Sequence, residues 1–164
     1  MNKKLIRVAA GQEPADLILK NSRALNVFTG EMIETDVAIA GGRIAALGDY
    51  YNATKVVDLS GRYLVPGFLN AHCHVESSMV TPPCYCAEEL RHGVTTLITD
   101  PHEIANVAGV SGIRYMLEST QFLPINYYVQ LPSCVPATIF EHAGAVLSAT
   151  DLAPLLEESR VLGL

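Results

Sequence analysis

Residues 66–79 read PGFLNAHCHVESSM, and two of their histidines, His72 and His74, stand two positions apart. The apolar run that precedes them, Leu64–Ala71, predicts a buried strand that continues into the histidines. Side chains two apart on a strand point to the same face of the sheet, so both imidazoles are expected to project together. Parallel barrels and open α/β sheets place their sites at the carboxyl ends of such strands. Two neutral imidazoles there can share one cation, although a His-x-His pair alone is more often a chance arrangement at a strand end.

The chain after Pro66 alternates between strand and helix patterns. Thr81 before Pro82 predicts the start of a helix, and Gly93 suits the left-handed position at its end. The β-branched run VTTLIT predicts a second strand, VAGVSGIRYMLEST a second helix and INYYVQL a third strand. Thr150 is expected to cap the helix DLAPLLEES, after which VLGL begins a fourth strand. This alternation is typical of a parallel sheet or barrel.

Residues 16–65 follow another pattern, in which short β-prone runs are separated by turn residues. Gly41 and Gly42 lie between two such runs and predict a hairpin, because glycine tolerates positive φ. The stretch TKVVDLSGRYLVPG adds two more short strands. We therefore expect a small antiparallel β domain over residues 1–65 and an α/β domain over residues 66–164.

Composition narrows the class of protein further. Of 164 residues, 49% are apolar, and the net charge is −6 with no basic cluster, which argues against a nucleic-acid surface. No run approaches the roughly 18 apolar residues of a membrane helix, and Arg7 interrupts the apolar start, so we expect neither a membrane span nor a secretory signal. The four cysteines form no CxxC pair, and reduced thiols in a cytoplasmic protein are the expectation. Cys84-x-Cys86 lacks a matching second pair and is assigned to packing or chance and not to a metal.

Two stretches taken together resemble a known family. GRYLVPGFLNAHCHVESSM and GVTTLITDPHEIANVAGVSGI are similar to the signatures PGFIDAHxHxESSM and DPHEIANV of the adenine deaminases, a family of the amidohydrolase superfamily. The stretches GGRIAALGD and VVDLSGRYLVPG resemble the superfamily's N-terminal sandwich half, and LPSCVPAT and EHAGAVLSATDL also resemble the family. The resemblance covers nearly the whole chain. Its most specific part is ESS combined with DPHE, because dihydroorotases and hydantoinases share the His-x-His pair.

The resemblance implies an α/β fold in which part of a small β-sandwich is followed by an incomplete TIM-type (β/α) barrel of the metal-dependent hydrolases. His72 and His74 match the first-strand metal ligands of the superfamily. The implied cofactor is a pair of divalent ions, Mn or Fe, with Zn as an alternative. The implied reaction is attack of a metal-activated hydroxide on C6 of adenine, with release of ammonia and formation of hypoxanthine. The implied partner is this small purine, and we expect a homo-oligomer.

Six further polar residues match the family and are candidates for the substrate pocket. They are Glu76, Ser77, Ser78, Asp100, His102 and Glu103. The residues themselves also fit simpler interpretations, because Asp100-Pro101 is a common turn and His102 with Glu103 suits a helix start. Three polar residues at a strand's carboxyl end nevertheless favour the pocket.

Three other residues bear on the metal. Asn70 stands where the family more often has aspartate, and it lacks a negative charge with which to orient a ligand histidine, although its carbonyl can accept a hydrogen bond. His92 is expected at a helix end and His142 on a solvated loop, and neither is given a ligand role.

The length of the chain sets a further expectation. A complete barrel takes about 250 residues, and residues 66–164 can supply three βα units and the opening of a fourth strand. The resemblance places the remaining ligands in later strands, so no catalytic residue is expected within the chain, only beyond Leu164. The chain alone is therefore expected to be inactive.

Two alternative functions remain open. One is a cyclic amidohydrolase of the dihydroorotase or hydantoinase kind, against which ESS and DPHE argue. The other is a non-catalytic fragment in which the histidine pair binds metal structurally or binds nothing.

Overall fold

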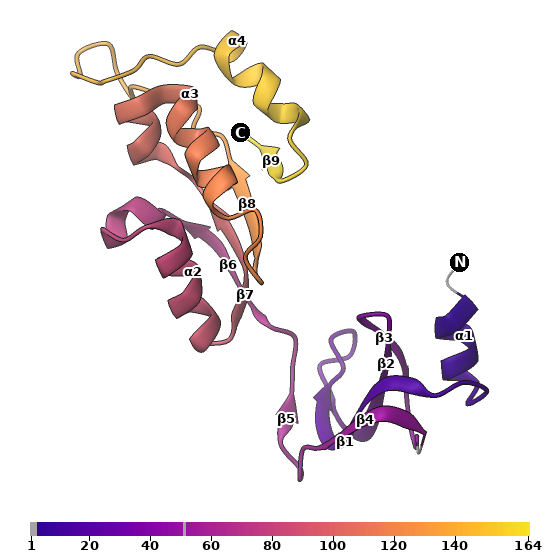
Figure 1. Ribbon diagram of the computed structural model, residues 1–164. Coiled ribbons are helices and arrows are strands. Elements are labelled where there is room, and N and C mark those ends of the chain that lie inside the picture. The colour runs from indigo at the N-terminus through magenta and orange to yellow at the C-terminus, as the bar shows by residue number, and fades with distance from the viewer. Residues whose placement is uncertain (1–2, 51) are drawn as a thin grey trace. The chain divides into compact units, whose positions relative to one another are not determined.

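The computed structural model describes residues 3–50 and 52–164, which divide into two compact units, residues 1–66 and 67–164 (Figure 1). Each unit has its own hydrophobic core. None of the helices in the described residues combines the length and the apolar character that a membrane span requires.

The first unit is built on a five-stranded sheet. Its elements are α1 (Lys3–Ala9), β1 (Ala15–Leu25), β2 (Met32–Ala40), β3 (Arg43–Leu47), β4 (Ala53–Asp58) and β5 (Tyr63–Leu64). The expected hairpin is present, because β2 and β3 pair antiparallel around Gly41 and Gly42, which both have positive φ. β4 and β5 instead pair parallel to β1, so the expectation of a purely antiparallel domain is wrong. The sequence pattern predicts where strands lie but not how they pair. Two strands that no tight turn connects can pair in either direction.

Helix α1 was not expected from the sequence. Its residue Val8 is buried with Ile18 of β1 and Ala38 of β2 in the core of the first unit. A helix of seven residues is too short to be stable alone, so these tertiary contacts hold it in place.

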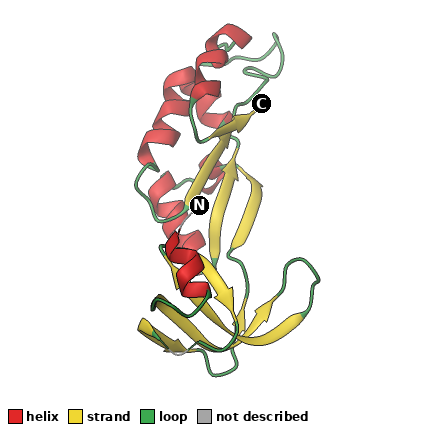
Figure 2. Cartoon of the chain, turned by 90° about the vertical axis from the view of Figure 1, so that its right-hand side faces the viewer, coloured by secondary structure: helices red, strands yellow, loops and turns green. Residues whose placement is uncertain are grey.

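The second unit is a four-stranded parallel sheet in the order β6-β7-β8-β9, with its helices on one face (Figure 2). Its strands are β6 (Phe68–Cys73), β7 (Val94–Thr99), β8 (Asn126–Gln130) and β9 (Val161–Gly163). Its helices are η1 (Val75–Ser78), α2 (Pro82–Arg91), α3 (His102–Ser119), α4 (Ala149–Leu152) and η2 (Ala153–Glu157), where η marks a 3₁₀ helix. The expected alternation of strands and helices is confirmed, and the chain as a whole is a mixed α/β protein.

Two helices differ from the expectation. α3 begins at His102, as the helix-start interpretation of His102 and Glu103 predicted, but before the run VAGVSGIRYMLEST. Gly109 interrupts it with non-helical angles, φ 60° and ψ −142°. The last helix is capped by Ser148 and not by Thr150, because the Asp151 carboxylate accepts a hydrogen bond from the Ser148 amide at 2.8 Å. It then tightens into the 3₁₀ helix η2, whose first turn contains a proline.

The core of the second unit lies between the sheet and the helices. Leu97 of β7 and Ile113 of α3 are fully buried in it, and Cys73 of β6 packs against it. Since neighbouring residues of a strand point to opposite faces, His72 points away from the face on which Cys73 packs. Cys73 therefore serves packing.

Two positions on α3 test the assignment of this core. Ile113 is fully buried, whereas Val107 is 69% exposed. We expect Ile113→Ala to lower the free energy of unfolding by about 2–5 kcal/mol, because it leaves a cavity. Val107→Ala is expected to change it by no more than about 0.5 kcal/mol. Urea unfolding followed by circular dichroism measures both, and equal losses would contradict the assignment.

Candidate metal centre

β6 and β7 end at the same level, which brings the residues that follow them together. Cys73 pairs with Thr99, and the amide of Asp100 donates a hydrogen bond to the carbonyl of Cys73 at 3.0 Å. His74 and Asp100 are therefore the first residues beyond two neighbouring parallel strands. This is the edge of the sheet at which the sequence predicted a site.

His72, His74 and Asp100 form a cluster in which one potential ligand atom from each lies within 4.8 Å of the others. The Nε2 atoms of the two histidines are 3.2 Å apart, and the rings meet edge to face with centroids 5.0 Å apart. Two imidazole nitrogens that each lie about 2.1 Å from one tetrahedral cation are roughly 3.4 Å apart. The observed separation therefore fits a shared cation. Across residues 3–50 and 52–164, no other group of three or more such side chains is close enough to hold an ion.

Asp100 adds a carboxylate whose hydrogen bonding is incomplete. Its Oδ1 atom is buried without a hydrogen-bond partner in the described residues, and its Oδ2 atom lies 3.9 Å from Nδ1 of His102. A buried carboxylate oxygen without a partner is costly in free energy. A cation beside His72 and His74 would offset that cost, so the donor set fits a divalent metal.

Glu103, in the first turn of α3, contacts one of the two histidines. Its Oε2 atom lies 3.1 Å from Nδ1 of His74, and its Oε1 atom accepts a hydrogen bond from the Ser77 hydroxyl at 3.0 Å. Burial by itself raises the pKa of the Glu103 carboxyl, but its own backbone amide, Ser77 and His74 outweigh burial and hold the pKa below its usual value. Glu103 is therefore an ionised acceptor at neutral pH.

Glu76 ties the turn after β6 to α3. Its Oε1 atom accepts a hydrogen bond from the Ile104 amide at 3.1 Å, while Oε2 is buried without a partner among the described residues. Burial raises the pKa of the Glu76 carboxyl, although the hydrogen bond from Ile104 acts against the shift. Ser78 faces its own turn and donates to the Val75 carbonyl at 2.6 Å.

The structure thus separates the sequence-predicted site residues into groups. Asp100 joins the two histidines, Ser77 and Glu103 contact each other beside His74, and His102 lies next to Asp100. Whether any of these residues touches a substrate stays a prediction. The sequence did not predict the contact between His74 and Glu103. One signal for it existed, because Glu103 follows Asp100 by only three residues and so lies near the same edge of the sheet.

The structure gives a local role to each of the three residues discussed beside the candidate ligands, Asn70, His92 and His142. The Asn70 side-chain carbonyl accepts a hydrogen bond from the His72 backbone amide at 3.4 Å, so it stabilises the strand and not a ligand ring. His92 ends α2 and donates through Nδ1 to the Glu88 carbonyl at 3.0 Å. His142 is exposed in a loop.

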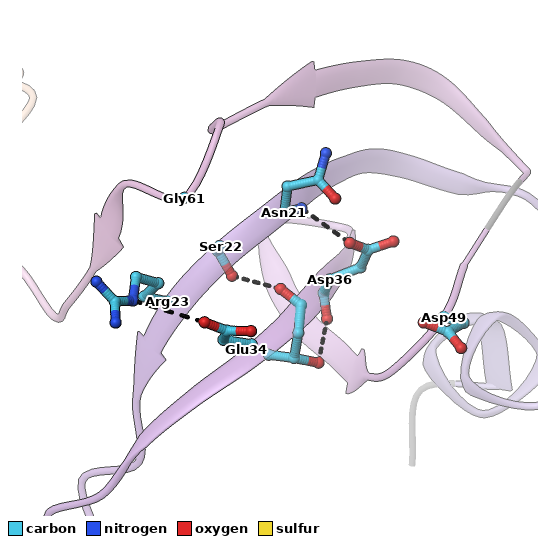
Figure 3. A pocket seen from close by; sticks show the side chains of 8 residues that line it. Asn21, Ser22, Arg23, Glu34, Asp36, Asp49 and Gly61 are labelled. Atoms are coloured by element: carbon cyan, nitrogen blue, oxygen red, sulfur yellow. Dashed lines mark hydrogen bonds and ion pairs between the residues drawn. The ribbon is translucent and has the colours of Figure 1, made fainter.

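The first unit has a polar hollow of about 320 Å³ (Figure 3). The Ser22 hydroxyl donates a hydrogen bond to the Thr35 carbonyl at 2.6 Å, and the Asp36 carboxylate accepts one from the backbone amide of Asn21 at 2.9 Å. The ammonium group of Lys20 lies 3.5 Å from the other carboxylate oxygen of Asp36. These polar groups partner one another beside an irregularity in the β1–β2 register, and this hollow is assigned to the stability of the sheet.

The cysteines differ in how far their thiols are available. Cys84 and Cys134 are exposed, whereas burial raises the pKa of Cys73 and raises that of Cys86 to about 11. We expect the two exposed thiols to react with iodoacetamide at pH 8 at least about 100-fold faster than Cys86, because the thiolate is the nucleophile. Mass spectrometry of partly alkylated protein measures the rates. Similar rates for Cys84 and Cys86 in the folded chain would contradict their placement on α2.

Comparisons with known proteins agree with this geometry. The amidohydrolase family profile matches residues 63–161. Adenine deaminase 2 of Carboxydothermus hydrogenoformans is 52% identical over 99% of this chain and 28% of its own length. The adenine deaminase of Geobacillus kaustophilus is 54% identical over 97% of this chain and 27% of its own length.

Solved structures share the fold at low sequence identity. A triazine hydrolase variant superposes with a TM-score of 0.64 and 15% identity, covering 90% of this chain and 45% of its own. The N-acyl-D-glutamate deacylase of Bordetella bronchiseptica, complexed with zinc, superposes with a TM-score of 0.59 and 18% identity, covering 86% of this chain and 34% of its own.

The chain therefore shares its mixed α/β fold with these solved structures and carries a His-His-Asp cluster at the carboxyl edge of its parallel sheet. More specifically, the chain belongs to the amidohydrolase family. It spans a little over a quarter of the length of the curated relatives that it matches.

Proposed function

We propose that this chain is the N-terminal part of an adenine deaminase, which converts adenine and water to hypoxanthine and ammonia. The observation that carries the proposal is about 50% identity, over nearly the whole chain, to proteins named adenine deaminase. The cluster at the carboxyl edge of the sheet supports a hydrolytic reaction. The proposed activity is that of the complete protein and not of these 164 residues alone.

We propose that the second unit opens a TIM-type barrel. Its four strands are parallel and lie side by side in the order of the sequence, with helices on one face only, which is how such a barrel begins. The first unit is proposed as part of a β-sandwich. An apolar groove of about 530 Å³, lined among others by Phe28, Ile44 and Val65, supports this because it offers a face that further strands could cover.

The proposed cofactor is a pair of divalent ions, Mn or Fe, with Zn as the alternative. His72 and His74 would hold one ion through Nε2, and Asp100 supplies a carboxylate oxygen beside them. A divalent cation at this place supplies Lewis acidity, which makes water available as a nucleophile near neutral pH. The chain's own part is to present these donors at one edge of a rigid sheet, with Glu103 and Ser77 supporting His74.

The proposed substrate is tested by ammonia release from the complete protein supplied with manganese or ferrous ion. We expect turnover of adenine and no comparable turnover of adenosine or dihydroorotate. Hydrolysis of dihydroorotate without deamination of adenine would replace the proposal with a cyclic amidohydrolase. A homo-oligomeric state and a cytoplasmic location stay predictions, and light scattering of the complete protein checks the first.

A further inference from the structure

We infer that Glu103 is a positioning residue for the metal ligand His74: its carboxylate holds the ring proton on Nδ1 and so leaves Nε2 as the free lone pair that faces His72. This inference rests on the proposed metal site and is independent of which substrate the complete protein uses.

The tautomer of His74 follows from what its two ring nitrogens face. A neutral imidazole carries one N–H donor and one lone pair. Nδ1 lies 3.1 Å from Oε2 of Glu103, and an ionised carboxylate can only accept a hydrogen bond. Nδ1 is therefore the donor, and Nε2 carries the lone pair. Histidines that bind metals commonly donate their second ring N–H to a carboxylate in this way.

His72 faces the other ring nitrogen of His74. Its Nε2 atom lies 3.2 Å from Nε2 of His74, where two lone pairs would repel each other. In metal-free protein His72 therefore donates its Nε2–H to His74. A cation that binds both nitrogens takes the place of this proton, and His72, whose side chain is exposed to water, then carries its proton on Nδ1. Metal binding thus changes the tautomer of His72 and leaves that of His74 unchanged.

Glu103 is itself held from two directions. The Ser77 hydroxyl donates to its second carboxylate oxygen at 3.0 Å, so both oxygens are engaged. Glu76 accepts the Ile104 amide at 3.1 Å and thereby anchors the turn of α3 that carries Glu103. The Glu103 side chain remains 46% exposed, so its removal should weaken metal binding more than it weakens the fold.

The experiment uses the complete protein and Zn²⁺, which is diamagnetic. NMR of ¹⁵N-labelled histidine, in solution or in the solid state, reports the tautomer of each ring at a pH where the rings are neutral, and competition with a chelating dye reports Zn²⁺ affinity. In metal-free wild type we expect His74 as the Nδ1–H form and His72 as the Nε2–H form. With Zn²⁺, His72 should change to Nδ1–H.

The variants separate positioning from general stability. Glu103→Ala is expected to lower Zn²⁺ affinity about 10–100-fold and to give His74 a mixture of tautomers. Glu103→Gln should lose less affinity, because its amide oxygen still accepts from Nδ1. Glu88→Ala is the matched control, since Glu88 is an exposed glutamate 3.9 Å from Nδ1 of His92, outside the cluster. It should leave Zn²⁺ affinity within about twofold of wild type.

Two results would overturn the inference. One is a wild-type His74 with its proton on Nε2, a measurement that needs no variant to fold. The other is a folded Glu103→Ala chain that binds Zn²⁺ as tightly as Glu88→Ala does. Failure of the complete protein to deaminate adenine would refute the proposed function and leave this inference to be decided by the tautomers.

Discussion

Replacement of either His72 or His74 by alanine is expected to remove adenine deamination from the complete protein without unfolding it. Each change deletes one of the two nitrogens that lie 3.2 Å apart. Removal of a residue that only hydrogen-bonds to a metal ligand typically lowers metal affinity or activity by up to about 100-fold. Removal of a ligand itself should lower the activity by more than that. The fold should survive because neither ring belongs to a hydrophobic core of the chain, and the His74 side chain is 32% exposed.

The measurement combines three quantities for each variant: turnover of adenine with saturating manganese or ferrous ion, metal content, and the melting temperature. His92→Ala is the control, since His92 only ends α2. It should keep wild-type turnover and metal content. A His72 or His74 variant with near-normal turnover and full metal content would show that the ligand assignment is wrong.

The second large effect concerns the chain by itself, for which we expect no detectable turnover of adenine. The described residues bring together two histidines and one aspartate, and the further metal ligands that the family resemblance implies belong to later strands, which are not among the described residues. The chain covers only 27–28% of the length of the two adenine deaminases compared above. The edge strand β6 also exposes the apolar side chains of Phe68 and Leu69, which favours self-association.

Ammonia release from the purified 164-residue chain, compared with the complete protein at equal molar concentration and metal supply, measures this difference. Light scattering of the same sample reports self-association. Turnover that follows the chain through purification and is absent from its His72→Ala variant would contradict the prediction.

Much of the second unit could be predicted from local signals. The β-branched run Val94–Thr99 forms β7, and α2 has the expected cap at Thr81, with Gly93 in the left-handed conformation after its end. The two-residue spacing of His72 and His74 placed both rings on one face, because strand side chains alternate. These features depend on residues a few positions apart, so the sequence contains them directly.

Other features depend on contacts between distant residues. The parallel pairing of β4 with β1, the helix α1 and the kink at Gly109 were not predicted, because each is decided by what the segment packs against. The contact between His74 and Glu103 joins residues 29 positions apart. It exists because β6 and β7 pair with Cys73 opposite Thr99.

The sequence by itself therefore determined the two candidate metal ligands, the alternation of strands and helices, and the family to which the chain belongs. Only the tertiary structure decided that Asp100 joins the histidines and that Glu103 holds one of them. The physical reason is that propensity and periodicity describe how one segment folds and which way its side chains point. The register between strands, which sets which side chains meet, is fixed only when the whole sheet and its core assemble.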